Sequence, residues 1–256
     1  MTDLKGRWAL VTGAARGIGY GAAVFLAQHG CNLILHGRSE THCNDVLAKV
    51  REYGVEVHVV SAEFSNLHTV SAMLAEIDSL GVRVDIVLNN AGIQIAYRND
   101  YLLTPVSDYD MSFKINTIAP MMIAYHFLPK MAEAGFGRIV NTTSGIRLEP
   151  QQAGYSASKA ALDKVTMDLA AQYEGTDVCI SLADPGWCRT DLGGPNAPNS
   201  PESSLPGVVL GAFIDDKHSG RCFSAGDFHG MTLEEALEKV YAGYPVYTGS
   251  VDYVTH

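Results

Sequence analysis

A tyrosine and a lysine lie four residues apart, at Tyr155 and Lys159. In a helix, residues at i and i+4 share one face, so the phenol and the ammonium would be neighbours. A positive charge next to a phenol favours the phenolate and lowers its pKa. This converts a side chain with an ordinary pKa of about 10 into a proton donor and acceptor for neutral pH. The same spacing also occurs on solvated helix faces, so the pair indicates chemistry only together with other motifs.

The elements that would position this pair alternate along the chain. Short apolar runs predict strands, and amphipathic stretches between them predict helices. The expected strands cover residues 8–11, 32–35, 55–60, 84–88, 138–141 and 178–182, and the first helices cover 17–29, 42–53 and 67–80. Near-continuous apolar strands separated by helices indicate a parallel sheet covered on both faces. Right-handed crossovers then give a doubly wound α/β fold.

A glycine-rich turn joins the first expected strand to the first expected helix. Its residues are Gly13, Ala15, Arg16, Gly17, Ile18 and Gly19, with the glycines spaced as GxxxGxG. Glycines at such a turn let backbone amides approach a pyrophosphate, which then lies at the helix N-terminus. The turn therefore predicts a dinucleotide site.

The end of the second expected strand indicates which dinucleotide the site would bind. An acidic side chain at this position usually binds the ribose 2′-hydroxyl of NAD, but the chain has Gly37 followed by Arg38. A guanidinium can bind a 2′-phosphate with paired hydrogen bonds, and Arg16 can reach the same group. The pattern favours NADP(H) over NAD(H); a solvated loop arginine is the alternative for Arg38.

Taken together, these motifs resemble the classical short-chain dehydrogenase/reductase family. The resemblance covers nearly the whole chain up to about Leu192. It is carried by residues 12–19, Asn89–Gly92 after the fourth strand, Asn116, Ser144, Tyr155, Lys159 and Pro185–Gly186 after the sixth strand. It implies a single Rossmann-type domain over residues 1–256. Such a domain has a parallel sheet of about seven strands in the order 3-2-1-4-5-6-7, flanked by helices.

The resemblance also implies roles for individual residues. Tyr155 would exchange a proton with the substrate oxygen, and Ser144 would hydrogen-bond the same oxygen. Lys159 would lower the Tyr155 pKa and bind the nicotinamide ribose, and Asn116 would hold a water that relays protons. Further cofactor contacts are expected at Glu63, Phe64, Asn90, Ala91, Gly92, Pro185, Gly186 and Thr190. Ser144 as a strand-end cap and Asn116 as an ordinary helix residue are the alternatives.

The substrate is less well defined. Candidate contacts are Gln94, Ile95, Arg147, Gln152 and Trp187. Residues 186–197 and 219–227 resemble a subset of the family that consists largely of NADPH-dependent carbonyl reductases. Residues 193–218, rich in glycine and proline up to Pro206, are expected to form a substrate lid; a variable connection is the alternative. Residues 232–256 are a tail that could cover the cleft, contact a neighbouring subunit or cover its own core.

Composition limits the partners. The net charge of −10 argues against nucleic-acid and anionic-membrane partners. The five cysteines are scattered without metal-ligand spacing, which predicts free thiols in the cytoplasm. The nine histidines form no ligand pattern, and hydride chemistry needs no metal, so none is expected. By resemblance, helices at 120–131 and 155–173 would pair in a homodimer or homotetramer.

The leading hypothesis is an NADP(H)-dependent oxidoreductase that interconverts a small carbonyl compound and an alcohol, with Tyr155 as general acid/base. One alternative is a sugar or polyol dehydrogenase that works in the oxidative direction. Another is a non-catalytic NADP sensor, but relatives of that kind typically lose the tyrosine–lysine pair. An epimerase or dehydratase would need a larger C-terminal domain than the residues after Pro185 provide.

Overall fold

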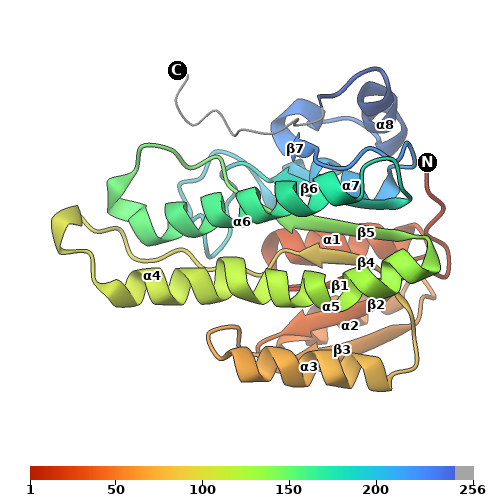
Figure 1. Ribbon diagram of the computed structural model, residues 1–256, viewed down its shortest axis with the longest axis horizontal. Helices are drawn as coiled ribbons and strands as arrows, with labels where there is room; N and C mark the ends of the chain where they lie inside the picture. The colour runs from red at the N-terminus through yellow and green to blue at the C-terminus, as the bar shows by residue number, and fades with distance from the viewer. Residues whose placement is uncertain (246–256) are drawn as a thin grey trace.

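Seven parallel strands form one sheet in the computed structural model, which describes residues 1–245 (Figure 1). The strands run in the order β3-β2-β1-β4-β5-β6-β7. Their bounds are β1 (Trp8–Val11), β2 (Asn32–Gly37), β3 (Val57–Ser61), β4 (Val84–Asn89), β5 (Gly137–Thr142), β6 (Val178–Asp184) and β7 (Cys222–Ser224). The predicted order is confirmed. Because all pairs are parallel, the carboxyl ends of the strands lie along one edge of the sheet.

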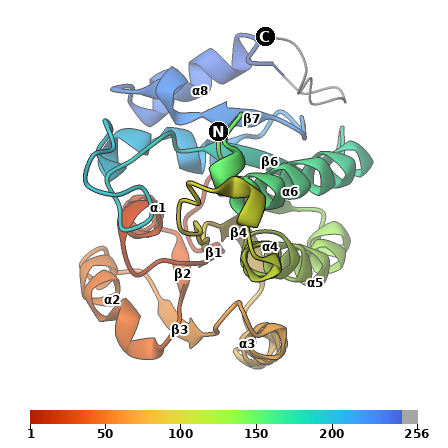
Figure 2. The same cartoon turned by 90° about the vertical axis from the view of Figure 1, so that its left-hand side faces the viewer.

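Helices cover both faces of this sheet. They are α1 (Gly17–Gln28), α2 (Asn44–Arg51), α3 (Leu67–Ser79), α4 (Val106–Phe113), α5 (Ala119–Ala134), α6 (Ala153–Gln172), α7 (Leu210–Phe213) and α8 (Leu233–Tyr241). A π-helical turn over Lys114–Ile118 joins α4 to α5. Figure 2 shows α1 and α2 on one side of the sheet, and α3, α5 and α6 on the other. The architecture is the predicted doubly wound fold.

Side chains on β2 show how each strand serves two cores. Leu33 and Leu35 are buried in one cluster with Leu26 of α1, whereas Ile34 is buried in the opposite cluster with Val70 of α3. Alternate residues of a strand point to opposite faces, so a strand covered on both faces must be apolar throughout. The continuous apolar runs in the sequence have this physical origin.

The expected substrate lid is only partly a surface segment. Gly193 and Gly194 line the large cleft described below. In contrast, Gly207–Val209 forms a 3₁₀ turn that leads into α7, and Val208, Val209 and Phe213 are buried in the core beside α8. The expectation of a lid as far as residue 218 is therefore wrong for residues 207–213, which fill the sheet face near β6 and β7.

The predicted helix start after Thr232 is present as α8. Thr232 is its N-cap, and a reciprocal pair of hydrogen bonds with Glu235 forms a capping box. The remainder of the expected tail, residues 246–256, lies outside the described residues. Within residues 1–245, no helix is both long and apolar enough to cross a membrane.

Candidate active site

A cleft of about 1420 Å³ opens at the carboxyl ends of the strands. Residues from the loops after β1, β2, β4, β5 and β6 line it. In a parallel doubly wound sheet, ligands bind in the crevice where the strand order reverses, which here lies between β1 and β4. The position of the cleft follows from the topology, and its chemistry from the residues that the loops supply.

The glycine turn between β1 and α1 is shaped by close backbone contacts. Gly13 has φ of 65° and Gly17 has φ of 57°, a region that favours glycine. A Cβ at Gly19 would lie 2.2 Å from the carbonyl oxygen of Gly13. These three positions therefore favour glycine, and without side chains there the backbone at the start of α1 lines the cleft. This cradle fits a dinucleotide pyrophosphate.

Asn90 fastens the end of β4 to this turn. Its side-chain amide donates hydrogen bonds to the carbonyl oxygens of Thr12 and Gly13, at 3.1 and 3.3 Å. The backbone amides of Asn90 and Ala91 donate to the Thr12 hydroxyl at 3.0 Å. The loop after β4 therefore supports the glycine turn, and Asn90, Ala91 and Gly92 all line the cleft.

His36 at the end of β2 also supports the glycine turn, a role that its position in the sequence did not reveal. The Gly13 amide donates to its Nδ1 at 3.2 Å, so the proton is on Nε2, which donates to the carbonyl of Ala62 at 3.1 Å. Burial lowers the pKa of His36 to about 4, and its ring stacks on Phe64. The neutral imidazole is thus a structural part of the nucleotide end.

The expected cofactor residues Gly37, Arg38, Glu63 and Phe64 line this end of the cleft, and so does His42. A Cβ at Gly37 would lie 2.9 Å from the sulfur of Cys43, so this position has no room for a side chain. Arg16 also lines the cleft, but it forms an ion pair with Asp191 in the loop after β6. The sequence analysis missed this pair, which joins two loops across the cleft.

Tyr155, Lys159 and Ser144 line the same cleft at its other end. Tyr155 is 6% exposed on α6, and Ser144 follows β5. Burial raises the pKa of Tyr155, the charges of Asp184 and Asp163 raise it further, and a hydrogen bond with Ser144 opposes the rise. The expected lowering of the Tyr155 pKa by Lys159 is therefore not found: desolvation of the phenol dominates.

Lys159 turns its ammonium toward the strand end. Its Nζ donates to the carbonyl oxygen of Thr142 at 2.7 Å, and the residue is 5% exposed. Burial lowers the pKa of Lys159 to about 8, while Asp163 and Asp184 favour its charged form. The lysine is therefore close to its titration point at neutral pH.

Asn116 lies in the π-helical turn and is fully buried. Its Oδ1 accepts a hydrogen bond from the Ile93 amide at 2.8 Å. Its Nδ2 donates to the Ile93 carbonyl at 2.9 Å and to the Ser158 hydroxyl at 3.0 Å. The side-chain amide thus joins the loop after β4 to α6. Both side-chain amide protons of Asn116 therefore have acceptors within the protein, and the expected relay water stays a prediction.

The expected substrate residues divide into two groups. Gln94, Arg147, Gln152 and Trp187 line the cleft, as do Pro185, Gly186 and Thr190. Ile95 does not; its carbonyl instead accepts a hydrogen bond from the Gln152 amide at 3.0 Å. The sequence analysis missed Tyr97, Met111, Asp184 and Leu192, which also line this end. No local pattern identifies them, because they come from separate segments: the loop after β4, α4, the end of β6 and the loop after β6.

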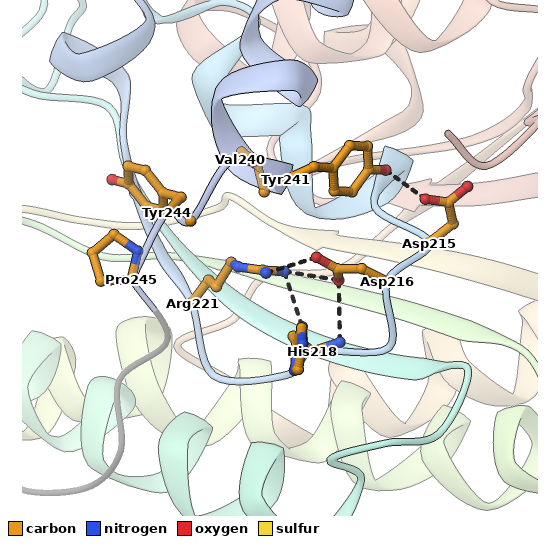
Figure 3. Close-up of a pocket in the computed structure, with 9 residues that line it drawn as sticks. Asp215, Asp216, His218, Arg221, Val240, Tyr241, Tyr244 and Pro245 are labelled. Atoms are coloured by element: carbon orange, nitrogen blue, oxygen red, sulfur yellow. Dashed lines mark hydrogen bonds and ion pairs between the residues drawn. The ribbon is translucent and has the colours of Figure 1, made fainter.

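A second hollow of about 630 Å³ lies between α8 and the loop before β7 (Figure 3). Arg221 donates from its two terminal nitrogens to Asp216 at 2.9 and 2.7 Å, and the Tyr241 hydroxyl donates to Asp215 at 2.6 Å. These contacts pair the charged groups of the hollow with one another. In the part of the chain that the structure describes, no group of three His, Cys, Asp or Glu side chains could hold a metal ion.

Comparison with known proteins places this geometry in context. The sequence profile of the family described as short chain dehydrogenase matches residues 7–200. The 3-oxoacyl-acyl-carrier-protein reductase FabG of Aquifex aeolicus is 32% identical over 194 residues, which cover 74% of this chain and 77% of the relative. Among solved structures, a putative short chain dehydrogenase from Pseudomonas syringae superposes with a TM-score of 0.78. It is 28% identical, and the match covers 87% of this chain and 96% of the other. A metagenomic short-chain oxidoreductase in complex with NADP has a TM-score of 0.73 and 27% identity, with coverage of 85% and 96%.

Proposed function

Because the chain belongs to the short-chain dehydrogenase family, we propose that it is an NADP(H)-dependent oxidoreductase that interconverts a carbonyl compound and an alcohol. One observation carries this proposal: Ser144, Tyr155 and Lys159 line the same cleft as the glycine turn. A group that can move a proton thus shares a cavity with a cradle for a dinucleotide. A non-catalytic sensor would need the cradle alone.

The protonation state of Tyr155 suits carbonyl reduction. A raised pKa keeps its hydroxyl protonated at neutral pH, as a general acid requires. The hydroxyl would donate its proton to the substrate oxygen, while Ser144 would orient that oxygen through a second hydrogen bond. The bound nicotinamide would supply the hydride in this direction and accept it in the other.

Lys159 would restore the proton. With a pKa of about 8, its ammonium can return a proton to the Tyr155 phenolate at little cost near neutral pH. Asn116 fixes the loop after β4 against α6 through its side-chain amide.

The residues of the nucleotide end favour NADP(H). Gly37 offers no carboxylate for a ribose 2′-hydroxyl, and Arg38 and Arg16 line the cleft and could bind a 2′-phosphate. Glu63 and Phe64 would flank the adenine. Arg16 must leave Asp191 to take part, so the ion pair between them opposes its use by the cofactor.

The substrate end supports a ketone or aldehyde of small to medium size. Gln94, Arg147, Gln152 and Trp187 would contact it, together with Gly193 and Gly194 of the proposed lid. The name of the Aquifex relative describes a 3-oxoacyl reductase, which supports a ketone. Sugar or polyol oxidation uses the same residues in the reverse direction and is the second candidate.

Tyr155→Phe tests the proposal directly. NADPH oxidation is followed with a panel of ketones and aldehydes, and NADP⁺ reduction with alcohols and polyols. The best wild-type reaction should fall by several orders of magnitude in the variant, because a phenyl ring has no proton to transfer. NADPH binding, measured by fluorescence, should be unchanged.

Tyr173→Phe is the matched control, because Tyr173 lies just past the end of α6 and does not line the cleft. Its turnover should equal that of the wild type. Turnover retained by Tyr155→Phe would contradict the role of Tyr155. A wild-type protein that binds NADPH but turns over none of the compounds would favour a sensor.

Assembly and location are also proposals. Tyr125 on α5 and Ile118 before it are exposed apolar residues, which supports pairing of two copies through this helix. All five cysteines are free thiols, which supports a reducing compartment such as the cytoplasm. Light scattering at micromolar concentration would measure the assembly, and a single chain there would reject it.

A further inference from the structure

The end of β5 contacts α6 at three successive turns. Lys159 donates to the carbonyl of Thr142, and Ser144 is near enough to Tyr155 to oppose the rise of the Tyr155 pKa. Thr143 lies between Thr142 and Ser144, and its hydroxyl donates to Oδ1 of Asp163 at 2.5 Å. Because Tyr155, Lys159 and Asp163 are spaced i, i+4 and i+8, they follow one another along one face of the helix. The tyrosine–lysine pair therefore continues into a third residue.

Asp163 and Asp184 are the two carboxylates that favour the charged form of Lys159. Within residues 1–245, the Thr142 carbonyl is the one hydrogen-bond acceptor of the Lys159 ammonium. A buried ammonium with one neutral acceptor is costly to keep charged. Asp163, one helical turn away, is the strongest influence that favours the charged lysine, ahead of Asp184. It does not line the cleft, so it acts on Lys159 and not on a substrate.

We propose that Asp163 is a positioning residue for the reaction: anchored by Thr143, its carboxylate holds Lys159 in the charged form beside Tyr155. This inference rests on the proposed roles of Tyr155 and Lys159. The anchor fixes the carboxylate against the residue that directly precedes Ser144. The Thr143 hydroxyl thus holds the carboxylate on the face of α6 that carries Tyr155 and Lys159.

The other groups that face Asp163 are consistent with a carboxylate at neutral pH. Burial and the charge of Asp184 raise the pKa of Asp163 to about 6, while Thr143 and Lys159 oppose the rise. Cys222 on β7 is a neutral thiol, because burial and the nearby carboxylates raise its pKa to about 12. On α4, which packs against α6, Asp108 is paired with Arg98. Lys159 is thus the cation that interacts with the Asp163 carboxylate.

Asp163→Asn removes the charge and keeps an acceptor for the Thr143 hydroxyl. The Lys159 titration is read by NMR of ¹³Cε in lysine-labelled protein without cofactor or substrate, with Lys159→Met to assign the signal. The pKa of Lys159 should fall from about 8 by roughly one pH unit. If the charged lysine is required, turnover should fall about fivefold at pH 8 and less than about 1.5-fold at pH 6.5.

Asp168→Asn is the matched control, because Asp168 is an exposed carboxylate on the same helix, paired with Lys164. It should move neither the Lys159 signal nor the pH profile. A second reading needs no variant: in the wild type, the Lys159 signal should show a smaller inflection near pH 6, where Asp163 takes up a proton.

An unchanged Lys159 pKa in Asp163→Asn, or no inflection in the wild type, overturns the inference whatever the turnover. A shifted Lys159 pKa with an unshifted pH profile would also overturn it, since Asp163 would then not serve the reaction. Absence of turnover in the wild type, with the NMR shift intact, would instead overturn the proposed function.

Discussion

Relative to the wild type, Lys159→Met should stabilise the protein more at neutral pH than at alkaline pH. It does so although it removes a residue of the proposed reaction. Burial lowers the pKa of Lys159 from 10.5 to about 8 in the folded protein. Between these values the unfolded chain binds more protons than the folded chain, so stability rises with pH. The contribution of Lys159 to stability is complete above pH 10.5 and is lost as pH falls through 8. Methionine has similar volume and no proton to bind.

The magnitude follows from the two pKa values. Charging the buried lysine lowers the free energy of unfolding by about 3 kcal/mol at pH 7.5 and by about 1 kcal/mol at pH 9.5. Methionine also leaves the Thr142 carbonyl without its donor, which costs about 1–3 kcal/mol independently of pH. The relief of the buried charge and the loss of the hydrogen bond to Thr142 therefore partly offset each other in the stability of the variant. Only the first effect depends on pH. The advantage of Lys159→Met over the wild type should shrink by about 2 kcal/mol from pH 7.5 to pH 9.5.

Urea unfolding followed by circular dichroism at the two pH values measures this difference. Asp163, with a pKa of about 6, is ionised at both and does not contribute. Lys164→Met is the control, because Lys164 is exposed on the same helix and its charge costs little to solvate. If the difference between Lys159→Met and the wild type were the same at both pH values, the lysine would not be desolvated, and the reasoning on its pKa would be refuted.

Two further predictions concern the nucleotide end. Asp191→Asn frees Arg16 from its ion pair, so NADP⁺ should bind several-fold more tightly in a fluorescence titration, while NAD⁺ binding stays the same; equal NADP⁺ affinity would show that Arg16 does not meet the 2′-phosphate. Gly19→Ala places a Cβ where the Gly13 carbonyl lies, so the turn must move and dinucleotide binding should be lost. Gly21→Ala, two residues further along α1, meets only a leucine methyl at 3.4 Å and should bind as the wild type does.

Much of the fold could be predicted because its determinants are local or periodic. The run at 33–35 is apolar at every position, which a strand needs when both its faces are covered. Gly30 follows α1 with φ of 77°, a conformation that glycine adopts without strain, so the end of the helix was also predictable. The cofactor turn was recognisable for a similar reason: Gly13 and Gly17 have positive φ, and a Cβ at Gly19 would meet the Gly13 carbonyl six residues earlier.

Other features depended on contacts that no local pattern reports. The glycines and prolines of residues 193–206 suggested a lid that extended to residue 218, yet Val208, Val209 and Phe213 fill the core beside α8. An ordinary helix residue was the alternative for Asn116, but the residue lies in a π-turn and its side chain bonds to Ile93 and Ser158. In both cases a partner distant in the sequence determines the local structure.

The sequence by itself determined which groups could react. Tyr155 and Lys159 at helical spacing, Ser144 after a strand and the glycine turn are matters of residue type and short-range spacing. The tertiary structure alone decided how these groups ionise. A pKa depends on burial and on nearby charges: the enclosure of Tyr155 raises its pKa, and Asp184 on β6 joins Asp163 of the same helix in favouring the charged form of Lys159. Desolvation is a property of the packed interior, so no spacing along the chain could have supplied it.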